Sequence, residues 1–104
     1  MTTPLSLDTA RRKDGTVALV AAGEIDLSNV AVFADALNKA VTQTDTKPVT
    51  VDLSAVEYLD SGAINVLFDR ANDVRVIANP LLIPVLKVSG LADLTTVVPP
   101  ETGG

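Results

Sequence analysis

The sequence lacks cysteine and histidine, the two residue types on which many catalytic and metal sites depend. Without cysteine there is no disulfide, no thiolate metal ligand and no thiol nucleophile. Without histidine, the most frequent general base and metal ligand is missing as well. With only two Phe and one Tyr, stacking on nucleic-acid bases is not favoured. These absences argue against enzymatic activity, and we expect no metal and no cofactor.

Long apolar runs and an excess of basic residues are also missing. No stretch approaches the ~20 apolar residues of a membrane-spanning helix, and the first eight residues do not resemble a secretion signal. Eight Lys and Arg residues oppose 13 Asp and Glu residues, which gives a net charge of −5. Such a surface repels phosphate backbones and suits a basic protein partner. We therefore expect a cytoplasmic chain that contacts neither membranes nor nucleic acid directly.

The composition of what remains is that of a packed globular protein. Of the 104 residues, 47% are hydrophobic and 20% are charged. This length and balance predict one domain over residues 1–104, of which 99–104 form a loose tail.

Alternating and apolar runs predict the strands. Leu5–Asp8 alternates, Lys13-Asp14-Gly15 carries the Asp-Gly signal of a hairpin turn, and the apolar run Thr16–Ala22 follows, ended by Gly23. Residues 54–59 are expected to connect a strand to a helix. Further strands are predicted at 49–53, 74–78 and 94–98.

Two helices are predicted to begin at capping residues. Ser28 is expected to cap the first helix, with Leu27 either stapled onto Val32 or pointing outward as an anchor. Asp60 is expected to cap the second helix, which would place Ser61 in its first turn.

A third helix is predicted from Asn79-Pro80 to an end at Gly90, with a buried stripe of Leu82, Val85 and Leu86. Because Pro84 lacks an amide donor, the first turn of this helix is expected to be distorted. The order ββαβαβαβ indicates an α/β fold, a mixed four- to five-stranded sheet with about three helices packed on it. Right-handed crossovers then bring the Gly23–Ser28 loop close to the Asp60-Ser61 turn.

Few residues offer chemistry of their own. No phosphate-binding GxxxxGK[ST] or GxGxxG motif occurs, and the acidic groups Glu24/Asp26 and Asp52/Glu57/Asp60 are typical of solvation and helix capping. Ser61 differs, because a hydroxyl in the first turn of a helix lies beside backbone amides that favour an anion. Phosphorylation there would add a charge that the helix tolerates, although a serine that merely starts a helix is the simpler alternative.

Three motifs occur in order along the chain: Gly23-Glu24-Ile25-Asp26, Val51-Asp52-Leu53 followed by Tyr58-Leu59-Asp60-Ser61-Gly62, and Ser89-Gly90-Leu91. Together they resemble the hallmarks of STAS domains, and more narrowly of single-domain bacterial anti-sigma factor antagonists. The resemblance covers Leu5 to Val98 and implies the STAS fold, although no final helix is evident.

The resemblance also implies a function. In that family the serine matched by Ser61 is phosphorylated by the partner, an anti-sigma factor that is itself a serine kinase, and the residue matched by Asp26 lies beside it. The unphosphorylated antagonist binds the anti-sigma factor and frees a sigma factor, the phosphorylated form lets go, and a phosphatase resets it. The alternatives are a STAS interaction module of another complex, with Ser61 unmodified, and an enzyme that uses Ser61 or the acidic residues.

We expect the partner to dock on the two loops and the start of the second helix. The predicted docking residues are Asp26, Leu27, Ser28, Asp60, Ser61, Gly62, Ala63 and Asn65.

Overall fold

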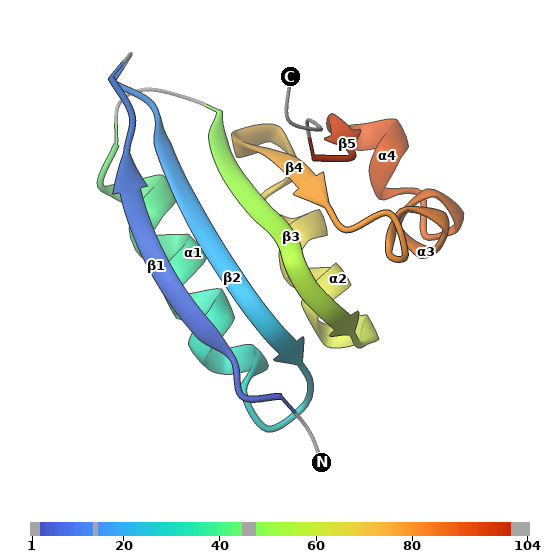
Figure 1. Cartoon of the computed structure of the whole chain (residues 1–104). Helices are drawn as coiled ribbons and strands as arrows, with labels where there is room; N and C mark the ends of the chain where they lie inside the picture. The colour runs from blue at the N-terminus through green and yellow to red at the C-terminus, as the bar shows by residue number, and fades with distance from the viewer. Residues whose placement is uncertain (1–2, 14, 45–47, 101–104) are drawn as a thin grey trace.

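A computed structural model describes residues 3–13, 15–44 and 48–100 of the chain. In this part of the chain, strands and helices alternate as the sequence predicts, with one additional short helix near the end (Figure 1). The elements are β1 (Ser6–Arg11), β2 (Val17–Ile25), α1 (Val30–Thr42), β3 (Val49–Leu59), α2 (Ser61–Asp69), a 3-10 turn (Ala71–Asp73), β4 (Val74–Ala78), α3 (Ile83–Val88), α4 (Leu91–Leu94) and β5 (Val97–Val98).

The strands form one mixed sheet in the order β1-β2-β3-β4-β5. β1 pairs antiparallel with β2, and each later pair is parallel. This confirms the α/β prediction and the hairpin between β1 and β2. The predicted turn residue Asp14 lies outside the described residues. At the hairpin, Gly15 N–H donates to the Arg12 carbonyl (3.0 Å).

Helices α1 and α2 pack side by side on one face of the sheet (Figure 1). Alternate side chains of the strands point into this layer, because successive residues of a strand face opposite ways. In β3 these are Val49, Val51 and Leu53, each fully buried against a core that includes Phe33 and Leu67 of the helices. The opposite face of the sheet carries no helix among the described residues.

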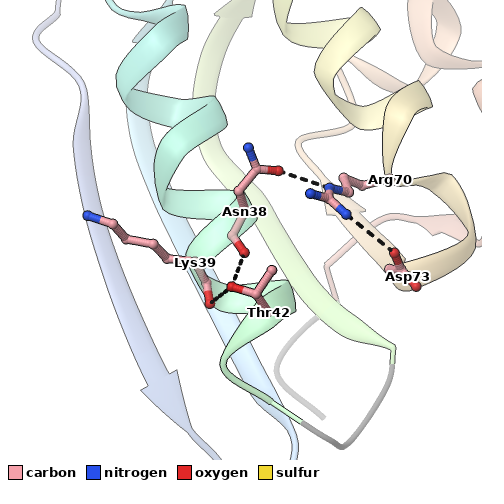
Figure 2. Close-up of polar contacts among 5 residues, drawn as sticks. All are labelled: Asn38, Lys39, Thr42, Arg70 and Asp73. Atoms are coloured by element: carbon pink, nitrogen blue, oxygen red, sulfur yellow. Dashed lines mark hydrogen bonds and ion pairs between the residues drawn. The ribbon is translucent and has the colours of Figure 1, made fainter.

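A polar contact joins the far ends of α1 and α2. Arg70, just after α2, donates from Nε to Oδ1 of Asn38 on α1 (2.9 Å), and its guanidinium lies 4.0 Å from Asp73 (Figure 2). The Thr42 hydroxyl donates back to the Asn38 carbonyl (2.8 Å) near the end of α1. These contacts hold the two helices in register at the end of the sheet opposite Ser61.

β2 and β3 are both longer than predicted. Gly23 does not end β2, which runs on to Ile25, and residues 54–59 belong to β3 instead of connecting it to a helix. The pairing between the strands shifts twice, between Val20 and Ala22 and between Gly23 and Glu24. Such bulges insert extra residues and break the alternation that sequence reading relies on.

The third helix starts later than predicted. α3 begins at Ile83, because the Asn79 side chain accepts from Leu81 N–H (3.0 Å) and turns the chain before the helix forms. Pro84 therefore falls in the first turn of α3, where no amide donor is needed. The first turn of the predicted helix is distorted, because Leu82 N–H and Ile83 N–H donate three residues back, to the carbonyls of Asn79 (2.8 Å) and Pro80 (3.4 Å). Val85 is 43% exposed and does not belong to the buried stripe.

The end of the described chain holds one element that the sequence did not predict. α4 follows Gly90, which ends α3 as expected with a positive φ of 92°. The predicted strand at 94–98 shortens to β5, and among the described residues no helix follows it. No helix in the part of the chain described is long and apolar enough to cross a membrane.

Candidate functional site

The loops that follow β2 and β3 lie against each other at one edge of the sheet. Parallel neighbouring strands end at the same edge, and Asp60 N–H donates to the Ile25 carbonyl across the two ends (3.1 Å). Gly62 faces the first residue of α1, since a Cβ added to it would lie 3.6 Å from Val30. The predicted meeting of the two motifs is therefore confirmed.

Hydrogen bonds within the β2–α1 loop hold it in shape. Oδ1 of Asp26 accepts from the Ser28 hydroxyl (2.5 Å) and from Ser28 N–H (2.9 Å). Asn29 completes the loop, because its side chain accepts from Asp26 N–H and donates to the Glu24 carbonyl, both at 2.9 Å. Ser28 is thus engaged with Asp26 and does not cap α1, which begins two residues later at Val30.

The Asp26 loop makes stability depend on pH. The hydroxyl and then the backbone of Ser28 lower the pKa of Asp26 below its ordinary value of 3.8. A carboxylate with a lowered pKa stabilises the fold above its ordinary pKa, and this contribution disappears as the pH falls through the folded-state pKa. We therefore expect Asp26→Asn to reduce the free energy of unfolding at pH 7. At a pH below the folded-state pKa of Asp26, the reduction should be smaller. Urea unfolding at both pH values measures this.

The matched control is Asp93→Asn. Within the described residues the Asp93 side chain has no hydrogen bond or ion pair, so its replacement is expected to change stability by the same small amount at both pH values. A penalty for Asp26→Asn that does not change with pH would contradict the role given to the loop.

Asp60 caps α2 as predicted. Its Oδ1 accepts from Gly62 N–H (2.9 Å) and from Ala63 N–H (3.2 Å). The prediction that free amides at the start of α2 could bind an anion is therefore largely wrong, because the Asp60 carboxylate already accepts from two of them.

Loss of the cap is expected to cost stability. Asp60→Ala removes the acceptor of two amides and should lower the free energy of unfolding by about 1 kcal/mol. Asp60→Asn keeps a capping oxygen and should cost much less. Thermal unfolding of the two variants separates the hydrogen bonds from the charge, and equal losses would contradict the capping role.

Ser61 is exposed at the first position of α2, and its hydroxyl has no hydrogen bond to the rest of the described chain. Its neighbours on the surface differ in exposure. Leu27 is 83% exposed, so its staple onto Val32 is wrong and it points outward. Ala63 is fully buried, so its side chain is part of the core and not of the surface. Of the remaining predicted docking residues, Ser28 and Asn65 are exposed and Asp26, Asp60 and Gly62 are partly buried.

Two further residues at this edge of the sheet, Asn29 and Tyr58, were not predicted from the sequence. Asn29 organises the loop, and its place between the end of a strand and the start of a helix was a signal for side-chain bonding to the backbone. Tyr58, 49% exposed, pairs with Glu24 near the end of β3 and lies at the same edge. In the described chain no three acidic side chains converge into a group able to hold a metal ion.

Comparison with known proteins decides the family. A family model described as Mlab, STAS domain matches residues 9–98. The chain belongs to the STAS domain family. The meeting of the loops after β2 and β3 is thus a feature of a STAS domain, and Ser61 lies at the start of its second helix.

Solved structures share this STAS fold. An anti-sigma factor antagonist from Mycobacterium paratuberculosis is similar with a TM-score of 0.81 at 24% identity, covering 93% of this chain and 87% of that one. The anti-sigma factor antagonist SpoIIAA in its unphosphorylated form gives a TM-score of 0.69 at 18% identity, covering 89% and 88%. The Bacillus cell fate determinant SpoIIAA in its phosphorylated form gives 0.63 at 18% identity, covering 89% and 91%.

Proposed function

We propose that this STAS domain is an anti-sigma factor antagonist that phosphorylation of Ser61 switches off. In its unphosphorylated form it binds an anti-sigma factor and so releases a sigma factor in the cytoplasm. The anti-sigma factor is a serine kinase that modifies Ser61, and a phosphatase restores the active form. The chain itself is not an enzyme in this scheme.

The observation that carries the proposal is the free hydroxyl of Ser61. It is exposed and unbonded within the described chain, and it lies between the Asp26 loop and the Asp60 cap. A kinase can therefore reach it without unfolding the helix. The structures of antagonists with the same fold, one of them described as phosphorylated, support the comparison.

The surroundings of Ser61 give a physical reason for release. A phosphate adds about −1.5 to −2 charges at pH 7. Asp60 already accepts hydrogen bonds from the amides of Gly62 and Ala63, so these amides are not available to bind the phosphate. The phosphate therefore stays on the surface that faces a partner. Asp60 directly precedes this position, and Asp26 lies in the neighbouring loop, one residue after the Ile25 carbonyl that accepts from Asp60 N–H. The added charge thus falls on a surface that is already acidic, where an interface with apolar or acidic partner groups is strongly disfavoured.

The same surface indicates the chemistry of the partner. Leu27 exposes an apolar side chain at the loop tip, which suits a pocket on the partner as an anchor. Around it lie acidic and polar groups on a chain with net charge −5. A partner with an apolar pocket for Leu27, basic residues at the rim of the interface and apolar groups opposite Ser61 fits both this pattern and release by a phosphate. The proposed docking surface comprises Asp26, Leu27, Ser28, Asp60, Ser61, Gly62 and Asn65.

Phosphorylation of the purified chain tests the proposal. We expect incubation with ATP and the cognate anti-sigma factor to add one phosphate, seen by intact mass. Ser61→Ala should remove that modification and keep binding. Ser28→Ala is the matched control, because it removes the other exposed serine of the surface and should still be phosphorylated. Modification of Ser61→Ala to the wild-type extent would contradict the proposal.

A second candidate is a STAS interaction module of another regulatory complex, without Ser61 phosphorylation. Two observations favour it: Gly62-Ala63 follows Ser61 where the antagonist motif has a hydroxyl residue and a glycine, and the matching family model is the Mlab type. The docking surface would be shared. A chain that binds its partner tightly but gains no phosphate from it supports this alternative.

A further inference from the structure

The helix-free face of the sheet carries a second group of polar side chains, far from Ser61. Alternate residues of β3 and β4 point to this face, among them Asp52, Ser54 and Arg75, while Val51 and Leu53 point into the core. Leu59, at the end of β3, follows Asp52 by seven positions, which is on the order of 20 Å at ~3.3 Å per residue. A ligand here would not touch the proposed docking surface.

A pocket of about 420 Å³ opens on this face. The volume lies within the range of small-molecule sites, roughly 300–1,000 Å³. Arg12, Asp52, Ser54 and Arg75 supply its polar lining, and Ile77 and Val98, followed by two prolines, supply an apolar wall.

The strand register brings both arginines to the same end of the sheet. Arg12 N–H donates to the Thr16 carbonyl (2.7 Å) just before β2, and Arg75 pairs with Thr50, which pairs in turn with Ala18. Ala18 and Thr50 lie between the arginine-bearing segments, and both have short side chains. Both are buried although no described helix covers this face, with relative exposures of 2% and 5%.

The two guanidinium groups are not neutralised by carboxylates. Within residues 3–13, 15–44 and 48–100, the ion pairs are Lys39–Asp35 and Arg70–Asp73, and neither involves Arg12 or Arg75. Two unpaired guanidinium groups around one pocket match a phosphate, whose oxygens accept paired hydrogen bonds from the planar arginine fork.

Asp52 makes the site selective for more than a bare anion. Its Oδ1 accepts from Ser54 N–H (3.0 Å) and from the Ser54 hydroxyl (2.6 Å), so its second oxygen is left to accept a further donor. A carboxylate beside an anion is unfavourable unless the ligand also brings a hydroxyl or amine to it. The pocket thus combines a phosphate-binding side, an acceptor for hydroxyl groups and an apolar wall.

We propose that this pocket binds a sugar phosphate, with the phosphate on Arg12 and Arg75 and a sugar hydroxyl on Asp52. Nothing in the docking of an anti-sigma factor requires this site, so the inference stands or falls independently of the proposed function. The domain would then bind a small metabolite on the face of the sheet opposite its helices.

A titration with glucose 6-phosphate, followed by NMR of the amide groups, tests the proposal. We expect the amides of Ser54, Arg75 and Ile77 to shift and that of Ser61 to stay. Arg12→Ala and Arg75→Ala should each weaken binding about tenfold or more, because each removes charge-assisted hydrogen bonds. Arg11→Ala is the matched control, since Arg11 is exposed on the neighbouring position outside the pocket, and it should leave the affinity within about twofold.

Inorganic phosphate and glucose complete the design. Glucose 6-phosphate should bind more tightly than either compound. Asp52→Asn should reduce the difference in affinity between glucose 6-phosphate and inorganic phosphate. Equal binding of the two phosphates overturns the role of the sugar. The proposal is also overturned if no pocket amide shifts at about 10 mM of either phosphate, or if Arg11→Ala weakens binding as much as Arg75→Ala does.

Discussion

Ser61→Glu is expected to weaken binding to the anti-sigma factor by about 10- to 100-fold, which corresponds to about 1.4–2.8 kcal/mol. Glutamate places a full negative charge at the first position of α2, directly after Asp60 and near the loop that holds Asp26. The helix itself should remain folded, because acidic side chains are favourable in a first turn. Isothermal titration or surface-based binding of the purified proteins measures the effect.

A matched control separates local repulsion from the overall change of charge. Gln43→Glu places the glutamate at an exposed position just after α1, at the end of the sheet opposite the two loops. It adds the same charge to the chain, and we expect it to leave the affinity nearly unchanged. Similar losses for both variants would show that the site around Ser61 is not the docking surface.

Gly23→Ala is expected to have the largest effect on stability, a loss of about 2–4 kcal/mol. Gly23 has a φ of +99°, and a Cβ added there would lie 2.2 Å from the Pro4 carbonyl oxygen. Backbone atoms cannot move aside as a flexible side chain does, so the segment before β1 must shift and the hydrogen bond from Glu24 N–H to the Thr3 carbonyl (3.2 Å) is lost. Urea unfolding of both proteins measures the difference.

Gly15→Ala is the control for this substitution. Gly15 also has a positive φ, +88°, but an added Cβ would meet nothing within 4 Å. Its replacement should therefore cost only the backbone strain, about 1–2 kcal/mol. Equal losses at the two glycines would mean that the close approach of Pro4 contributes nothing to the effect at Gly23.

Local signals were sufficient where one residue decides the structure. The Asp60 cap has a short side chain followed by free amides, and α2 begins directly after it as predicted. β4 occupies the predicted residues Val74–Ala78, because its buried and exposed residues alternate without interruption. The meeting of the two loops also followed from the parallel order of the strands.

Prediction failed where several groups compete for the same hydrogen bonds. Ser28 was expected to cap α1, but Asp26 takes its hydroxyl, and the helix starts at Val30. The two shifts of register between β2 and β3 depend on the partner strand, which a single-sequence pattern does not contain. In both cases tertiary contacts override a local preference.

The candidate docking site was predicted in outline and not in every side chain. Ser61 and Leu27 are exposed, because the first lies at the outer side of a helix start and the second at a loop tip. Ala63 follows Ser61 by two residues on the helix, which turns it toward the core, where it is fully buried. The pocket at Arg12 and Arg75 was not predicted, since only the register of the folded sheet brings residues so far apart in sequence together.

The most direct test compares the affinities of the unphosphorylated chain and of the same chain phosphorylated at Ser61 for one anti-sigma factor. Circular dichroism of both forms establishes that each is folded. A shift from 99% to 1% bound requires about a 10⁴-fold difference between two states, and a loss of about 100-fold or more places the phosphate at the interface. We expect that loss, with an unchanged fold. Equal affinities of the two folded forms would contradict it.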